Sequence, residues 1–349
     1  MKKRFFALII LMFNSMLSIS NIGALKELTA TWETRLGMVP YEYINFVFPT
    51  HYDLDDYLIL VEKDEQNAAL FKFKDSISSG TSESLKKNAF NEIELLASYK
   101  ISTGRAHGNK QKRGDLKTPE GLYYAQDFMS EQLLKSKYGS LAAQYGTGAW
   151  ELWYPNELDR LRQKTGSGIW IHGTDADMIP YDSEGCVRFE NDVITYFREV
   201  LNIRKTPIII NEVFEWVNME YLKNEVEKIN DFFSAWLDSW QKQNIDEYLS
   251  FYSTEHFVSN NQKMNYARWA THKKEAFNKE TFIDIKVSGL NYYYSDNMLL
   301  ISFTQEYTSS SMSDVGYKQL VFERAKSMEQ SIWSIIQEEW NPLPNTNSR

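Results

Sequence analysis

Cysteine is almost absent from this chain, because only Cys186 occurs among its 349 residues. An internal disulfide is therefore excluded. The thiol is a buried small side chain, a link to another molecule or a reactive group. Long apolar runs are scarce too, since nothing after residue 12 approaches the roughly 20 continuous apolar residues of a membrane-spanning helix.

Positive charge is also in short supply, with a net charge of −9 and no block rich in lysine or arginine. An acidic chain without a basic surface is a poor ligand for phosphate backbones, so nucleic acid is not an expected partner. What the chain does contain, 43% hydrophobic and 15% aromatic residues, is typical of a folded protein.

The N-terminus has the pattern of a secretory signal peptide. Three cations at positions 2 to 4 precede an apolar run over residues 5–12, and small residues follow up to Ala24. We predict a signal peptide over residues 1–24, whose removal would change the net charge from −9 to −12. An uncleaved anchor is the alternative, and cleavage would leave no stable membrane span. About 325 residues remain, enough for roughly two domains.

Extended patterns dominate the region from residue 56 to residue 215. Strand patterns cover residues 56–74, 93–103, 122–125, 168–172 and 208–216. The glycine-rich, charged stretch 104–121 is expected to be an exposed loop. Asn191 is placed to cap a helix whose apolar residues recur at helical spacing. We therefore predict one β-dominated domain over residues 56–215.

The pattern changes near residue 220. Apolar residues at helical spacing predict a helix over residues 226–240 and a second over 246–252. Beyond residue 282 the period is two, which predicts a curved antiparallel sheet and an α+β unit over residues 220–341. The adjacent tyrosines Tyr292–Tyr294 are a candidate for a glycan-binding cleft.

The two remaining stretches carry weaker signals. Residues 342–349 are expected to be a disordered tail. Residues 25–55 form an N-terminal segment with mixed helical and aromatic signals. The sequence leaves open whether this segment packs in cis or against a second copy in a homodimer.

The lone cysteine lies beside the groups that an acyl-transfer centre needs. His172 ends an apolar strand and is the natural base for a thiol, and the carbonyl of Gly173 can fix the imidazole tautomer. Gly185 permits a tight turn that aims backbone N–H groups, including that of Cys186, at a developing oxyanion. Arg188 lies on the same face of an extended segment and can hold a carboxylate.

A metal site is the main chemical alternative. His172, Asp175, Asp177 and Cys186 are suitable ligand types, but their spacing lacks the recurrent zinc patterns. Asp175 and Asp177 more simply stabilise the turn after His172. No metal is therefore expected, and no phosphate-binding loop signals a nucleotide.

Four motifs together resemble the YkuD-type L,D-transpeptidase family. They are "STG" at Ser102–Gly104, "TPEGLY" at Thr118–Tyr123, "IHGTDA" at Ile171–Ala176 and "SEGCVRF" at Ser183–Phe189. The run Tyr154–Asp175 and the helix-then-sheet C-terminal region resemble one branch of that family. Its members are periplasmic L,D-carboxypeptidases that set cell shape in curved and helical bacteria and carry a domain like nuclear transport factor 2 (NTF2).

The resemblance implies an α+β protein, with a β-rich catalytic domain followed by a cone-like domain of helices and a curved sheet. It implies a periplasmic enzyme that needs no cofactor and acts on peptidoglycan stem peptides. A thiolate would attack the carbonyl on the L-centre of diaminopimelate and expel the terminal D-alanine. By position, Cys186 would be the nucleophile, His172 the base and Gly173 its orienting carbonyl, with Arg188, Gly185, Glu184 and Ser183 in the substrate site.

The sequence departs from the family pattern at Glu184, where many members have histidine or arginine, and in a shorter spacing between His172 and Cys186. Both departures lie where an acceptor would meet the acyl-enzyme. Water as acceptor gives a carboxypeptidase, whereas an amine gives an L,D-transpeptidase that forms cross-links or wall attachments. A non-catalytic wall-binding scaffold is the third interpretation.

Overall fold

The computed structural model describes residues 32, 38–48, 55–73, 93–259, 263–326 and 331–343. The predicted signal peptide and residues 344–349 of the predicted tail lie outside the described residues. Within the described ranges, no helix combines the length and apolar character needed to cross a membrane.

The first part of the chain, residues 55–211, is called the N-terminal lobe and contains two sheets. The five-stranded sheet has the order β4-β3-β2-β10-β5, and the four-stranded sheet has the order β6-β7-β8-β9. The bounds in the first sheet are β2 Tyr57–Glu62, β3 Asn67–Phe73, β4 Ile93–Lys100, β5 Gly121–Tyr123 and β10 Ile208–Asn211. Those in the second are β6 Ala125–Ser130, β7 Gly148–Leu152, β8 Trp170–His172 and β9 Val187–Arg188. Most predicted strands are confirmed, and the predicted strand region 56–74 is an antiparallel pair of strands, β2 and β3.

Four helical segments cover the N-terminal lobe. They are α4 Glu131–Tyr138, the 3-10 helix η3 Gly139–Tyr145, α5 Glu157–Leu161 and α6 Asn191–Val200. The apolar face of α6, with Ile194 and Phe197, packs in one core with Ile171 and Val187 of the four-stranded sheet. This packing holds β8 and β9 in place, because one face of each strand is buried against α6.

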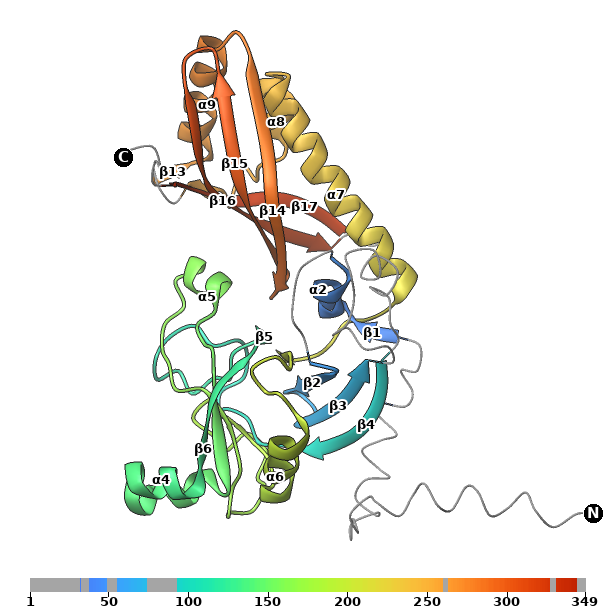
Figure 1. The fold of residues 1–349 in the computed structure, drawn as a ribbon, viewed down its shortest axis with the longest axis vertical. Coiled ribbons are helices and arrows are strands. Elements are labelled where there is room, and N and C mark those ends of the chain that lie inside the picture. Colours follow the sequence, from blue (N-terminus) through green and yellow to red (C-terminus); the bar gives the residue numbers. More distant parts are fainter. Residues whose placement is uncertain are drawn as a thin grey trace, which may run out of the picture.

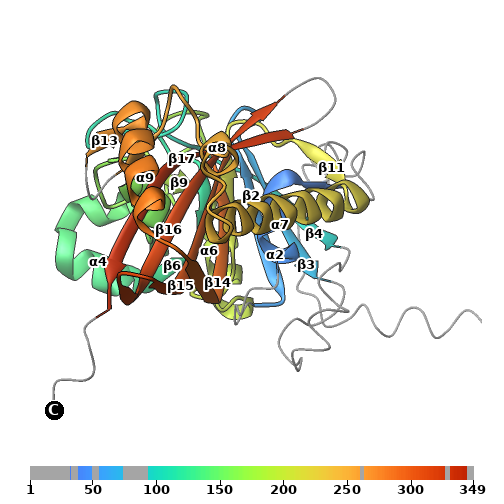
Figure 2. The same cartoon turned by 90° about the horizontal axis from the view of Figure 1, so that it is seen from above.

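Residues 219–343, called the C-terminal lobe, form the α+β unit that the sequence predicted. Three helices cover one face of a six-stranded sheet of order β13-β12-β17-β16-β15-β14 (Figure 2). The helices are α7 Met219–Gln241, α8 Ile245–Ser250 and α9 Tyr266–Lys279. The strands are β12 Val258–Ser259, β13 Met264–Asn265, β14 Ile283–Ser295, β15 Met298–Ser309, β16 Ser313–Lys326 and β17 Ser331–Pro342. The sequence patterns did not predict α9.

The other face of the C-terminal sheet meets the N-terminal lobe. Met298, Leu300 and Val321 pack in one cluster with Leu158 of α5. The candidate cleft at Tyr292–Tyr294 was wrong, because Tyr292 and Tyr294 are buried in the core. Tyr293 instead donates its hydroxyl hydrogen bond to the Leu122 carbonyl of the N-terminal lobe. These tyrosines thus pack inside the C-terminal lobe and against its neighbour.

The N-terminal segment lies between the two lobes over its described residues 38–48 (Figure 1). It contains β1 Met38–Pro40, the 3-10 helix η1 Tyr41–Tyr43 and α2 Ile44–Val47, and β1 pairs with β11 Trp216–Asn218. Tyr41, Tyr43 and Ile44 are almost fully buried. Asn45 exchanges hydrogen bonds with the backbone of Tyr294. These residues therefore pack in cis.

Candidate functional site

Strand alternation places the sequence-predicted side chains on one face of the four-stranded sheet. β8 and β9 are parallel, with Ile171 opposite Val187 and His172 opposite Arg188. Ile171 and Val187 point into the core behind the sheet. Because neighbouring side chains alternate, His172 and Arg188 point to the opposite face, and Cys186 shares that face.

His172 is held in one orientation by its neighbour. Its Nδ1 lies 2.6 Å from the carbonyl oxygen of Gly173. A carbonyl only accepts, so Nδ1 carries the hydrogen and Nε2 is free to take a proton. The imidazole is 3% exposed, and its ring makes an edge contact with Tyr145 at 5.1 Å. The predicted pairing of His172 with Gly173 is present in the structure.

Asn191 fixes the position of Gly173, which the sequence did not predict. The expected helix cap is wrong, because Glu190 precedes α6 as its N-cap and Asn191 is its first residue. The Asn191 side chain accepts from the Thr147 amide at 2.9 Å and donates to Asp175 at 2.6 Å. Its oxygen would lie 2.2 Å from a Cβ on Gly173. Only glycine fits between Asn191 and β8.

A tight turn over Ser183–Cys186, called the Cys186 turn, presents the thiol. Gly185 has φ +127°, which side chains rarely adopt, and a Cβ there would lie 2.8 Å from the Lys117 carbonyl oxygen. The buried Ser183 hydroxyl accepts from the Gly185 amide at 3.1 Å and donates to the Cys186 carbonyl at 2.6 Å. Ser183 thus stabilises the turn. The Gly185 N–H is used within the turn, because it donates to Ser183.

The two upstream motifs lie directly against the Cys186 turn. Ser102 forms a bridge with Arg188, and Gly104 forms one with Ser183. Thr118 donates from its hydroxyl to the Gly185 carbonyl at 3.0 Å and accepts from the Gly104 amide at 2.9 Å. The structure therefore brings together all four motifs that carried the family resemblance.

An aromatic wall borders the thiol, and its members come from the helical segments before β7 and from strand β8. Tyr138, Tyr145 and Trp170 form mutual ring contacts, with centroids 4.8 to 5.7 Å apart. Cys186 packs against the cluster that contains these rings. The half-buried thiol donates to the Gly168 carbonyl at 3.7 Å. The sequence offered no periodic signal for Tyr138 and Tyr145, which lie in short irregular helices.

The electrostatics keep both reacting groups neutral at rest. Burial, reinforced by nearby Arg188, lowers the pKa of His172 from 6.5 to about 4. Burial raises the pKa of the Cys186 thiol from 9.0 to about 11, against smaller opposing effects of the Trp170 amide and Arg188. At neutral pH, Cys186 is therefore a thiol and His172 a neutral imidazole.

Charged groups surround the mouth of the site. Arg188 donates to Asp182 at 3.1 Å, and its partly buried Nε has no hydrogen-bond partner among the described residues. Arg188 and Arg105 lower the pKa of the exposed Asp182 carboxyl. Glu184 is exposed at the Cys186 turn. Arg188 and Glu184 thus place opposite charges within two residues of Cys186 on either side.

The alternative metal site finds no support in the geometry. The described residues contain no group of three histidine, cysteine, aspartate or glutamate side chains arranged to hold an ion. Asp175 is engaged by Asn191 instead. In the loop after β8, the backbone carbonyl of Asp177 accepts from the Ile179 amide, whereas the sequence predicted a hydrogen bond with the Asp177 side chain.

Comparison with known proteins agrees with both lobes. Residues 56–210 match the L,D-transpeptidase catalytic domain family YkuD, and residues 228–339 match the Cds6 C-terminal NTF2-like domain. No curated protein matches the chain.

Two solved structures are similar over most of the chain. Bd1075 from Bdellovibrio bacteriovorus is 28% identical with a TM-score of 0.55, covering 88% of this chain and 99% of that one. The helical cell shape determining protein Pgp2 from Campylobacter jejuni is 24% identical with a TM-score of 0.56, covering 85% and 97%. The chain thus contains a YkuD-type L,D-transpeptidase domain in its N-terminal lobe and an NTF2-like domain in its C-terminal lobe.

Proposed function

We propose that this protein is a peptidoglycan L,D-carboxypeptidase, which removes the terminal D-alanine from tetrapeptide stems through a thioester on Cys186. One observation carries the proposal. Cys186, the single cysteine of the chain, lies on a turn that requires glycine at position 185. It shares a sheet face with His172, whose Nδ1 donates to the Gly173 carbonyl. The match to the YkuD family supports the choice of substrate class.

His172 acts first as the base and then as the acid. As the sulfur attacks the carbonyl on the L-centre of diaminopimelate, Nε2 of His172 takes the thiol proton. The C–N bond breaks, a thioester forms on Cys186, and the imidazolium gives its proton to the leaving amine of D-alanine. Water, deprotonated by the same nitrogen, then attacks the thioester and releases a tripeptide stem and the thiol.

Three groups of the turn and its strand would bind the reacting substrate. The backbone N–H of Cys186 stabilises the tetrahedral oxyanion, because the neighbouring Gly185 N–H is held by Ser183. The Arg188 guanidinium binds a substrate carboxylate in exchange for its contact with Asp182. Glu184, exposed beside the thiol, contacts the acceptor.

The setting of the reaction follows from the N-terminal pattern and the relatives. The signal-peptide pattern over residues 1–24 supports export to the periplasm, where peptidoglycan is accessible. Pgp2 is a helical cell shape determining protein. We extend a role in cell shape to this chain, since trimming of stems removes donors for cross-links.

A digest of purified muropeptides tests this function. The protein should convert disaccharide tetrapeptide to tripeptide with release of equimolar D-alanine, and Cys186→Ala should abolish both products. Cross-linked dimers in place of tripeptide would instead establish L,D-transpeptidation by the same acyl-enzyme. Binding to sacculi without either product would contradict both activities and favour a scaffold.

A further inference from the structure

A hairpin of the C-terminal lobe reaches the N-terminal lobe at its β14–β15 turn. Asp296 and Asn297 at its tip have φ +53° and +56°. The Asp296 carboxylate accepts from the Asn109 side chain at 2.9 Å and from Lys164 at 3.5 Å. The tip thus contacts two polar side chains of the other lobe.

The end of β14 next to this turn lies against β5. A Cβ on Gly121 would be 2.3 Å from the hydroxyl of Ser295, which is 2% exposed. Next to this contact, Tyr293 donates to the Leu122 carbonyl and accepts from Asn156 at 2.7 Å. The hairpin is therefore fixed at the point where the loop over residues 104–120 enters β5.

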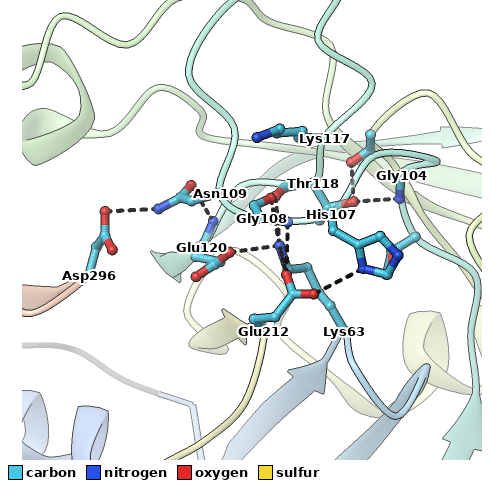
Figure 3. A network of polar contacts seen from close by, with 12 residues as sticks. Lys63, Gly104, His107, Gly108, Asn109, Lys117, Thr118, Glu120, Glu212 and Asp296 are labelled. Carbon is cyan, nitrogen blue, oxygen red and sulfur yellow. Dashed lines mark hydrogen bonds and ion pairs between the residues drawn. The ribbon is translucent and has the colours of Figure 1, made fainter.

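Asn109 within that loop and Lys63, which follows β2, connect the two limbs of the loop (Figure 3). The Asn109 oxygen accepts from the Glu120 amide at 3.0 Å. Lys63, whose side chain is 3% exposed, donates to the carbonyls of Gly108 and Thr118 and pairs with Glu120 at 2.8 Å. Since a buried ammonium needs several partners, these bonds hold the loop in one shape.

The far side of the loop supports the Cys186 turn. Thr118 holds the Gly185 carbonyl, and the Lys117 carbonyl lies where a side chain on Gly185 would be. A continuous set of hydrogen bonds and close contacts therefore runs from the tip of the C-terminal hairpin, through Asn109 and the 104–120 loop, to the residue before the thiol.

We propose that Asp296 and Asn109 are positioning residues, through which the NTF2-like domain holds the Cys186 turn in its reactive geometry. The inference rests on the proposed role of Cys186. The C-terminal lobe then contributes to the geometry of the catalytic site, because the β14–β15 hairpin anchors one end of the loop over residues 104–120. Displacement of the loop would move the Gly185 carbonyl and, with it, the sulfur.

Exchange of the two polar groups tests the contact itself. Asn109→Asp places two carboxylates against each other at 2.9 Å spacing. We expect this variant to lose about tenfold or more in kcat for tripeptide release, with little change in KM. The rate of Cys186 alkylation by iodoacetamide should fall in parallel. In the double variant N109D/D296N an amide faces a carboxylate again. The carboxylate introduced at position 109 still accepts from the Glu120 amide. The rates of tripeptide release and of Cys186 alkylation should therefore both recover.

Three controls make the result decisive. Thermal unfolding checks that each variant is folded, and Asp284→Asn, an exposed carboxylate on the same strand, should leave both rates within about twofold of the parent. A folded Asn109→Asp protein with unchanged rates, or a double variant no faster than the single one, would overturn the inference. If Asn109→Asp does not fold, the rates of tripeptide release and Cys186 alkylation are compared between Asp296→Asn and the double variant, and this comparison decides the inference. The alkylation assay needs no stem peptide, so it separates failure of this inference from failure of the proposed substrate.

Discussion

The side-chain oxygen of Asn191 lies 2.2 Å from the place that a Cβ on Gly173 would occupy. Asn191 is anchored there by the Thr147 amide and by Asp175. The Gly173 carbonyl therefore has a fixed position, and it holds Nδ1 of His172. Asn191 thus helps to fix the tautomer of His172 through the Gly173 carbonyl.

Gly173→Ala should consequently reduce the rate of tripeptide release by about tenfold or more, because the added methyl displaces Asn191 or the strand. Unfolding free energy should fall by about 1 to 3 kcal/mol. The Asn191→Ala background removes the clashing oxygen, so Gly173→Ala should cost less there, as a double-mutant cycle of rate and stability measures. Equal costs in both backgrounds would show that Asn191 is not the obstacle.

The pH dependence of kcat/KM reports the resting state of the pair. His172 must be neutral to take the proton, and its pKa is lowered to about 4, so activity should rise through about pH 4 and then stay level across neutral pH. Because the thiol pKa is raised to about 11, no thiolate accumulates in that range. A rising limb between about pH 6.5 and 9 would contradict a neutral resting pair.

Ser183→Ala should loosen the Cys186 turn. The substitution leaves the buried Gly185 amide without its acceptor, which costs about 1 to 3 kcal/mol of stability. Cys186 alkylation and tripeptide release should both slow. Asn218→Ala removes the cap of α7, whose side chain accepts from the Tyr221 amide at 2.8 Å, and is the matched control. It should cost about 1 kcal/mol without changing thiol reactivity. Equal effects of the two variants on alkylation would argue against a specific role for Ser183.

The sequence predicted correctly the strand that ends at His172, its contact with the Gly173 carbonyl and the tight turn at Gly185, because these depend on local patterns. Two short patterns predict this geometry from a few neighbouring residues. One is an apolar strand that ends in His-Gly, and the other is a glycine directly before the cysteine. Asn191, Tyr145 and Asp296 were missed because their roles come from contacts between segments far apart in the chain. Periodicity carries no signal for such contacts.

The same distinction holds for the fold. The long stripe of α7 and the alternation in β15 predicted the helix and the strand correctly. Helix α9 was missed because only two of its residues, Trp269 and Phe277, are buried, so its apolar stripe is short. The packing of residues 38–48 between the lobes likewise depends on tertiary partners.

Glu42, in the segment between the lobes, should make stability depend on pH. Its carboxylate accepts from Asn211 at 2.6 Å but is 7% exposed, and its second oxygen has no hydrogen-bond partner within the described ranges. Burial raises its pKa from 4.5 to about 7. The unfolded chain loses this proton first, so the protein should lose about 3 kcal/mol of stability as the pH rises from about 4.5 to 7.

Glu42→Gln should remove this slope and raise the unfolding midpoint at about pH 8 more than at about pH 5. Denaturant unfolding at several pH values measures the difference between variant and parent, in which contributions from other groups, including His172, cancel. Glu65→Gln, at an exposed position, is the control and should leave the slope unchanged. A parallel shift of the Glu42→Gln curve at every pH would contradict the buried, protonated carboxyl.

The most direct test of the central claim is the intact mass of the protein, quenched in acid during turnover of disaccharide tetrapeptide. The account predicts a species heavier by the disaccharide tripeptide minus one water, with the added mass on the peptide that contains Cys186. Cys186→Ala should show no such species. An adduct on another residue, or D-alanine release that persists in Cys186→Ala, would contradict the thioester mechanism.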